Sequence, residues 1–155
     1  MFRKNFRLNK LNHIISYQMN MKSIKEQALE MLQRCEVVIL ASVNKDGYPR
    51  PVPMSKIHTE GLNEIWMATG RNSLKTKDFV RNPHAGVCFS EAGNSVAMTG
   101  TVEIITDKAT KEKLWQDWFI DHFPGGAADK NYILLKFTGC HATLWIDGKF
   151  CHRKI

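Results

Sequence analysis

Short apolar segments joined by hairpin-length turns constrain this chain more than any other feature of its sequence. The β-branched run 37–43 (VVILASV) leads into turn residues 44–47, and an extended arm then runs to residue 58. A second turn at 60–63 precedes EIWMATG, and similar strand-like stretches are HAGVCFS, SVAMTGTVEIIT, NYILLKFTG, HATLWID and KFCHRKI. Parallel neighbours need crossovers of a dozen or more residues, so these short turns predict antiparallel pairing. We therefore expect a mainly β (α+β) fold, a small antiparallel barrel of six or seven strands with flanking helices.

Three helices are predicted beside these strands. Ser23 and Glu26 form a capping box, and apolar residues follow at helical spacing as far as Cys35. Asn72 or Ser73 caps a short helix that Pro83 ends, with Leu74, Phe79 and Val80 on its buried side. A third helix is expected from Asp107 to residue 123, and its spacing places Leu114, Trp115, Trp118 and Phe119 in the core or at a dimer contact.

The net charge of +7 is concentrated at the N-terminus. Residues 1–20 contain four basic residues and no acid, which leaves +3 for residues 21–155, where 18 basic residues face 15 acidic ones. We treat 1–20 as a basic N-terminal extension without a specific role, a transit peptide or an anion-binding tail, and 21–155 as the domain. The sequence does not favour a nucleic-acid partner, because the remaining charge is small and no RNA-binding signature is present. No apolar run approaches the ~20 residues that a membrane span needs.

The four cysteines do not form a metal or disulfide pattern. They are widely spaced without a CxxC motif, so we expect free thiols in a reducing cytoplasm. Two Cys-His pairs, Cys140-His141 and Cys151-His152, invite comparison with zinc sites. A two-residue turn at 147–148 would pair Cys151 with Leu144, well out of register with Cys140. Adjacent strand residues also point to opposite faces, so we predict no metal site.

An anion site is suggested where the strand 64–70 ends and the next helix begins. A glycine turn is followed by Ser73 as a capping residue and by Lys75 in the first helical turn. Unpaired amides and the helix dipole favour an anion there, and the hydroxyl and ammonium groups add to the attraction. The alternative is an ordinary N-cap with a solvated lysine, and the spacing alone leaves both interpretations open.

Three alternating prolines, Pro49, Pro51 and Pro53, mark one edge of the extended arm 48–58. Proline donates no hydrogen bond, so this edge is unpaired over that stretch. A flat polar heterocycle would then pair with strand amides such as that of Val52, while Arg50 approaches a phosphate or a ring oxygen. The alternative is an edge strand that proline protects from aggregation.

The order of these segments resembles a known family. RPVPM, EIWMATG, SLKTKDFVRNP, TGTVEIITD and the pattern W..WF..FPGG...NYILLKF occur as in the pyridoxamine-phosphate-oxidase-like split-barrel flavoproteins, in particular their small bacterial general-stress subfamily. The likeness extends from about residue 24 to residue 145. It implies a split barrel and a homodimer that binds FMN at the subunit interface.

The same resemblance assigns a set of cofactor-binding residues. Leu74 stands where the oxidases proper often carry an arginine, and the C-terminus is shorter, which argues against pyridoxamine-phosphate oxidation. The assigned residues are Arg50, Pro51, Val52, Pro53, Met54 and Ser55 along the isoalloxazine ring, Ala68 and Thr69 near the ribityl chain and phosphate, Ser73, Leu74 and Lys75 at the phosphate, and Asn94 and Ser95 where the partner subunit reaches the flavin.

The function expected from this resemblance is an FMN-dependent oxidoreductase. It would pass electrons from a small donor, such as NAD(P)H, to an acceptor that the sequence does not identify. The flavin carries the redox chemistry in such enzymes, so we name no catalytic side chain. A lone histidine among His58, His84 and His122 would at most line the cavity. The alternative is a flavin- or tetrapyrrole-binding stress protein without turnover.

Overall fold

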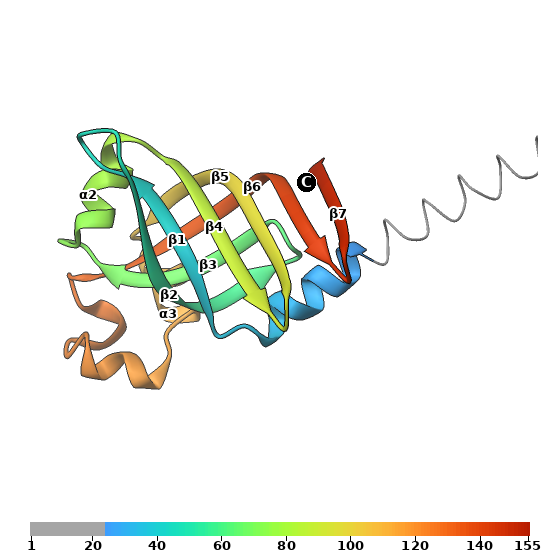
Figure 1. Cartoon of the computed structure of the whole chain (residues 1–155). Helices are drawn as coiled ribbons and strands as arrows, with labels where there is room; N and C mark the ends of the chain where they lie inside the picture. Colours follow the sequence, from blue (N-terminus) through green and yellow to red (C-terminus); the bar gives the residue numbers. More distant parts are fainter. Residues whose placement is uncertain (1–23) are drawn as a thin grey trace, which may run out of the picture.

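The computed structural model describes residues 24–155, and the seven strands within this part form one antiparallel sheet. Figure 1 shows the strands wrapped into a barrel. The capping residue Ser23 and the extension 1–20 lie outside the described residues. The strands are β1 (Val37–Val43), β2 (Pro49–Glu60), β3 (Glu64–Gly70), β4 (His84–Glu91), β5 (Asn94–Ile105), β6 (Tyr132–Ile146) and β7 (Lys149–Lys154).

Pairing of β3 with β6 closes the barrel. The strand order is β3-β2-β1-β4-β5-β6-β7, and the additional β3–β6 ladder joins the first strand of this order to the sixth. The result is a closed six-stranded antiparallel barrel with β7 as an extra strand, which confirms the predicted fold class. The four strand pairs joined by short turns, β1–β2, β2–β3, β4–β5 and β6–β7, are all antiparallel, as predicted.

The long strand β6 replaces the two strands expected over residues 131–147. It runs for 15 residues, and its register against β5 shifts between Thr99 and Gly100. At this irregularity a Cβ on Gly100 would collide with the carbonyl oxygen of Thr138, so only glycine allows the two backbones to approach so closely. A bulge therefore bends one strand where two were predicted.

The main core fills the barrel and includes the first helix, residues 24–34. This helix buries Ile24, Ala28, Met31 and Leu32 at helical spacing, as its sequence pattern predicts. The largest fully buried strand residues of this core are Leu40, Ile65, Met67, Leu135, Phe137 and Leu144. Helix 24–34 thereby stabilises the barrel through its apolar face.

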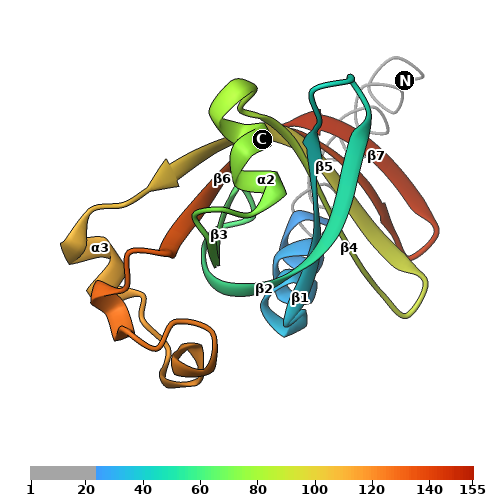
Figure 2. The same ribbon diagram turned by 90° about the vertical axis from the view of Figure 1, so that its left-hand side faces the viewer.

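The helix predicted over residues 108–123 is broken. Helix α3 (Lys108–Lys113), capped by Asp107, ends early and is followed by the 3₁₀ segments η1 (Asp117–Asp121) and η2 (Gly126–Ala128). This break lets Trp115 and Phe119 both reach Tyr132 of β6, with ring centroids 5.3 and 5.7 Å apart. These rings form a second core with Phe123 outside the main one, and Figure 2 shows this part of the chain projecting from one side of the barrel.

The β6–β7 register predicted around the cysteines is confirmed. All four cysteines are free, and Cys151 pairs with Leu144 in the β6–β7 ladder, which confirms the predicted register. Within residues 24–155 no three His, Cys, Asp or Glu side chains come together as a metal site would require. The helices of this part of the chain are also too short or too polar to cross a bilayer.

Candidate functional site

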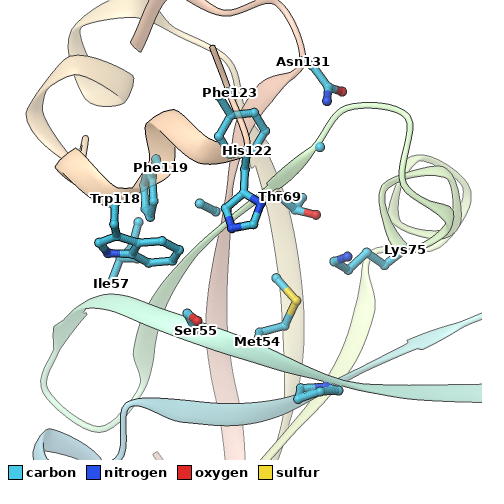
Figure 3. A pocket seen from close by; sticks show the side chains of 13 residues that line it. Met54, Ser55, Ile57, Thr69, Lys75, Trp118, Phe119, His122, Phe123 and Asn131 are labelled. Carbon is cyan, nitrogen blue, oxygen red and sulfur yellow. The ribbon is translucent and has the colours of Figure 1, made fainter. Parts of the chain in front are cut away.

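A cavity of about 380 Å³ opens between β2, β3, the start of helix α2 (Leu74–Arg81) and η1. We call it the β2–β3 cavity. Figure 3 shows Lys75 entering it from α2, with Trp118 and Phe119 on the opposite side. Its lining residues are Pro53, Met54, Ser55, Ile57, Ala68, Thr69, Gly70, Lys75, Trp118, Phe119, His122, Phe123 and Asn131.

Lys75 supplies the positive charge of this cavity. Partial burial, and then the charge of Arg50, lower the pKa of the Lys75 ammonium below its ordinary value. Among the described residues no carboxylate forms an ion pair with it. Burying a cation without a partner is unfavourable, and an anion bound in the cavity would offset this cost.

Hydroxyl groups fix the turn that presents Lys75. Ser73 is the N-cap of α2, and its Oγ accepts a hydrogen bond from the Thr76 N–H at 3.3 Å. The Thr76 hydroxyl donates to the Gly70 carbonyl at 3.0 Å, and the Thr69 hydroxyl donates to Ser73 Oγ at 3.4 Å. The Ser73 hydroxyl is therefore part of the cap, and Lys75 is the group of this turn that extends into the cavity.

The buried carboxylate of Asp78 fastens α2 to the barrel. Its Oδ2 accepts hydrogen bonds from Ser42 Oγ at 2.8 Å and from Arg50 Nη1 at 3.0 Å. Its Oδ1 accepts one from Arg81 Nη2 at 2.6 Å. The helix therefore turns Asp78, Thr76 and Phe79 inward.

The predicted buried side of α2 is wrong at two positions. Leu74 and Val80 are 61% and 73% exposed, whereas Phe79 is buried as expected. The polar anchor at Asp78 determines which face of the helix is buried, because breaking these charged hydrogen bonds would cost more than exposing two aliphatic side chains.

The free edge of β2 lies beside the prolines as expected, but the Val52 N–H does not face it. β2 pairs with β1 over residues 49–55 and with β3 only from Lys56 onward, so its second edge is open beside the prolines, as predicted. The residues that pair with β1 through hydrogen bonds must be the non-prolines, including Val52. The Val52 N–H therefore points to β1, and Ser55 provides the first N–H at the open edge.

An aromatic wall that the sequence did not reveal closes the far side of the cavity. Phe119 is buried, whereas Trp118 is half-exposed and packs edge-on against it at 4.5 Å. His122 points into the cavity between them and Lys75 (Figure 3). The Tyr132 hydroxyl, whose pKa burial raises to about 12, donates to the Lys111 carbonyl and holds this segment to β6.

The predicted site residues fall into three places. Six of them, Pro53, Met54, Ser55, Ala68, Thr69 and Lys75, line the β2–β3 cavity, and Ser73, Pro51 and Val52 adjoin it in sequence. Arg50 and Leu74 line a separate cavity between the β1–β2 turn and α2. Asn94 and Ser95 lie at the start of β5, where Ser95 pairs with Trp145 and Asn94 Oδ1 accepts the Asp147 N–H at 2.9 Å. Within the described chain they are not part of this cavity.

Most of the lining residues that the sequence did not predict lie in η1 and in the segment that follows it. Gly70 and Asn131 also belong to the unpredicted residues. The two residues lie close together, because a Cβ on Gly70 would be 3.2 Å from the Asn131 side-chain amide. The available sequence signal for the residues in and after η1 is the FPGG pattern at 123–126. It predicts that the helical segment ends there, directly after four aromatic or imidazole side chains. The complete set comprises Ile57, Gly70, Trp118, Phe119, Phe123 and Asn131, and His122 joins them as the one of the three lone histidines considered above that lines this cavity.

The fold and cavity define a small closed antiparallel β-barrel with a cavity at an open strand edge. The cavity offers a cation at one end and an aromatic wall at the other, which suits a flat ligand with an anionic end. The model of the pyridoxamine 5'-phosphate oxidase-like family matches residues 23–152. The chain belongs to this family.

Individual relatives agree with this assignment. General stress protein 26 of Bacillus subtilis (strain 168) is 28% identical over 127 residues, which cover 76% of this chain and 85% of that protein. A protein of Clostridium acetobutylicum related to general stress protein 26 superposes with a TM-score of 0.78 at 24% identity, covering 86% of this chain and 95% of its own. The general stress FMN/FAD binding protein of Xanthomonas citri gives a TM-score of 0.68 at 24% identity, covering 86% and 96%.

Replacing Asp78 with alanine tests its role as the anchor of α2. The variant loses three hydrogen bonds and leaves Arg50 without its carboxylate, so the free energy of unfolding should fall by roughly 2–4 kcal/mol. Urea denaturation measures this change. Glu91→Ala is the control, because it removes a carboxylate from an exposed ion pair with Arg34 and should change stability little. Equal losses in the two variants would contradict the anchor.

Proposed function

We propose that this protein binds FMN in the β2–β3 cavity and acts as an oxidoreductase. The observation that carries this proposal is Lys75, a partly buried ammonium that has no carboxylate partner among the described residues. A phosphate at this position would form a charge-assisted hydrogen bond with Lys75 near the first turn of α2. The family resemblance and the FMN/FAD binding stated for the Xanthomonas citri protein support a flavin as the ligand.

The remainder of the cavity suits the ring system of a flavin. The open edge of β2 offers the Ser55 N–H and backbone carbonyl groups, which match the donors and acceptors at the rim of an isoalloxazine. Trp118 and Phe119 provide aromatic surface for its faces. A bound flavin would supply the hydride or electron transfer, and the protein would supply orientation and exclusion of water.

The preference for FMN over riboflavin tests the phosphate contact. The two ligands share the ring and differ by the phosphate, so wild-type protein should bind FMN about 10- to 100-fold more tightly. Lys75→Gln should remove most of this preference, as measured by titrating flavin fluorescence. Lys77→Gln is the matched control, because Lys77 lies on the same helix but outside the β2–β3 cavity. An unchanged preference in Lys75→Gln would contradict the assignment.

The same preference should depend on pH. The pKa of Lys75 is lowered in the ligand-free protein, so its ammonium loses its proton below the ordinary lysine value as the pH rises. The phosphate is attracted by the charged form only. The ratio of FMN to riboflavin affinity should therefore be greatest at neutral pH and fall toward alkaline pH, whereas Lys75→Gln should show no such decline.

Turnover separates an oxidoreductase from a flavin or tetrapyrrole carrier. Under anaerobic conditions NADH or NADPH should bleach the flavin absorbance of the FMN-loaded protein faster than that of free FMN, and an added acceptor should restore it. Free FMN at the same concentration is the control. Bound flavin that is reduced no faster than free FMN would favour the carrier.

A cytoplasmic homodimer with FMN at its interface completes the proposal. The outward residues of β1, β4 and β5 bear no formal charge over the two rows that the ladders align across all three strands, which favours a contact face. One row comprises Ile39, Cys88 and Ala97. Val37 of β1 lines a neighbouring cavity together with Ser55 and Trp118, which also line the β2–β3 cavity, so a partner subunit on this side of β1 would lie near the proposed FMN.

Introducing a charge into this face tests the dimer. Ala97→Arg places a guanidinium in one of the two uncharged rows, where burial without a partner is unfavourable, so sedimentation velocity should show monomers. Glu112→Arg adds an arginine on the exposed surface of α3 and should leave the dimer intact. A wild-type protein that sediments as a monomer would refute the dimer.

A further inference from the structure

A second cavity of about 260 Å³ lies between the β1–β2 turn and helix α2. We call it the arginine cavity. It shares no lining residue with the β2–β3 cavity. Its lining consists of Asn44, Lys45, Asp46, Arg50, Leu74, Lys77, Asp78 and Arg81.

Two guanidinium groups are held in place in this cavity by one buried carboxylate. Asp78, whose side chain is 4% exposed, accepts hydrogen bonds from Arg50 on one oxygen and from Arg81 on the other. Each guanidinium has five N–H donors, and each uses one nitrogen on Asp78. The remaining donors of both groups make no hydrogen bond within residues 24–155, which leaves them available to an oxyanion.

The charges around this cavity do not balance. Four cations, Lys45, Arg50, Lys77 and Arg81, face two carboxylates, those of Asp46 and Asp78. In the part of the chain that the structure describes, neither Lys45 nor Lys77 forms an ion pair. A surplus of two positive charges therefore remains beside the paired arginines, which favours binding of an anion.

Arg50 links the two cavities. It lines the arginine cavity, and its charge acts on Lys75, whose ammonium lies in the β2–β3 cavity. An anion at Lys75 and an anion in the arginine cavity would thus both interact with the charge of Arg50. Leu74, which is 61% exposed, also borders the arginine cavity and offers apolar surface to the organic part of such a ligand.

We propose that the arginine cavity is a second anion subsite that binds a phosphoryl group in addition to the one at Lys75. This inference rests on the proposed function in placing the first phosphate at Lys75. The second phosphoryl group would belong either to the same ligand, as in a flavin adenine dinucleotide with its diphosphate, or to a separate phosphorylated molecule that binds beside FMN. Both sources present the same oxyanion to Arg50, Arg81, Lys45 and Lys77.

Calorimetric titration of the full chain tests the subsite. The double variant Lys45→Gln/Lys77→Gln removes the two cations that have no ion-pair partner and leaves the Asp78 anchor intact. Lys25→Gln on the exposed side of helix 24–34 is the charge control. The ligands are FMN, FAD and inorganic pyrophosphate, the last added both to flavin-free and to FMN-loaded protein.

A single ligand with two phosphates predicts that FAD binds roughly 10-fold more weakly to the double variant while FMN affinity changes less than about 2-fold. If the second phosphoryl group belongs to a separate molecule, the double variant should bind FMN and FAD with the affinities of wild type. Its FMN-loaded form should no longer bind pyrophosphate. Lys25→Gln should behave as wild type in both cases.

Two results would overturn the subsite. One is that FMN, FAD and pyrophosphate bind the double variant as they bind wild type, and the other is that FMN weakens as much as FAD. Failure of the flavin proposal is separate, since it appears as absent binding of both FMN and FAD to the wild-type protein. Pyrophosphate binding to flavin-free protein, and its loss in the double variant, would still support the arginine cavity in that case.

Discussion

The buried carboxylate of Asp78 determines how the rest of the site is arranged. It joins one helix to two strands, because its partners are Ser42 on β1, Arg50 on β2 and Arg81 on α2 itself. The helix is short, and a helix of eight residues has little stability without such contacts. Through this anchor the first turn of α2 is held at the barrel edge, so that Lys75 enters one cavity while Arg50 and Arg81 face another.

The β2–β3 cavity also depends on a strand that changes partners along its length. β2 pairs with β1 through its first half and with β3 only in its second half. The prolines enforce this change, because none of them has an N–H to offer to a neighbouring strand. The resulting gap in the ladder is covered by the aromatic segment that follows α3, which is itself fixed to β6 through Tyr132.

The sequence predicted the parts of this molecule that depend on local patterns. The bounds of β1 and β3, the cap at Ser73, the β6–β7 register and the position of Lys75 follow from alternation and turn residues. Contacts across long separations were not predictable. Asp78 lies 28 residues from Arg50 in the chain, and without that contact the amphipathic pattern of α2 favours the wrong buried face. Likewise, α3 ends at Lys113, just before Trp115 packs against the distant Tyr132, and local spacing does not reveal that Trp118 and His122 then reach the cavity.

The β3–β6 ladder has a consequence for when the binding site forms. It joins residues 64–70 to residues 132–138, so its closure must await a chain segment made much later than the strand it completes. Such non-local pairing is slow, since a long loop must be ordered before the contact stabilises it. During synthesis on the ribosome, β1 to β3 emerge first and remain without this partner until β6 has left the exit tunnel. The cavity, whose floor is β3, is therefore among the last parts of the protein to become able to hold a ligand.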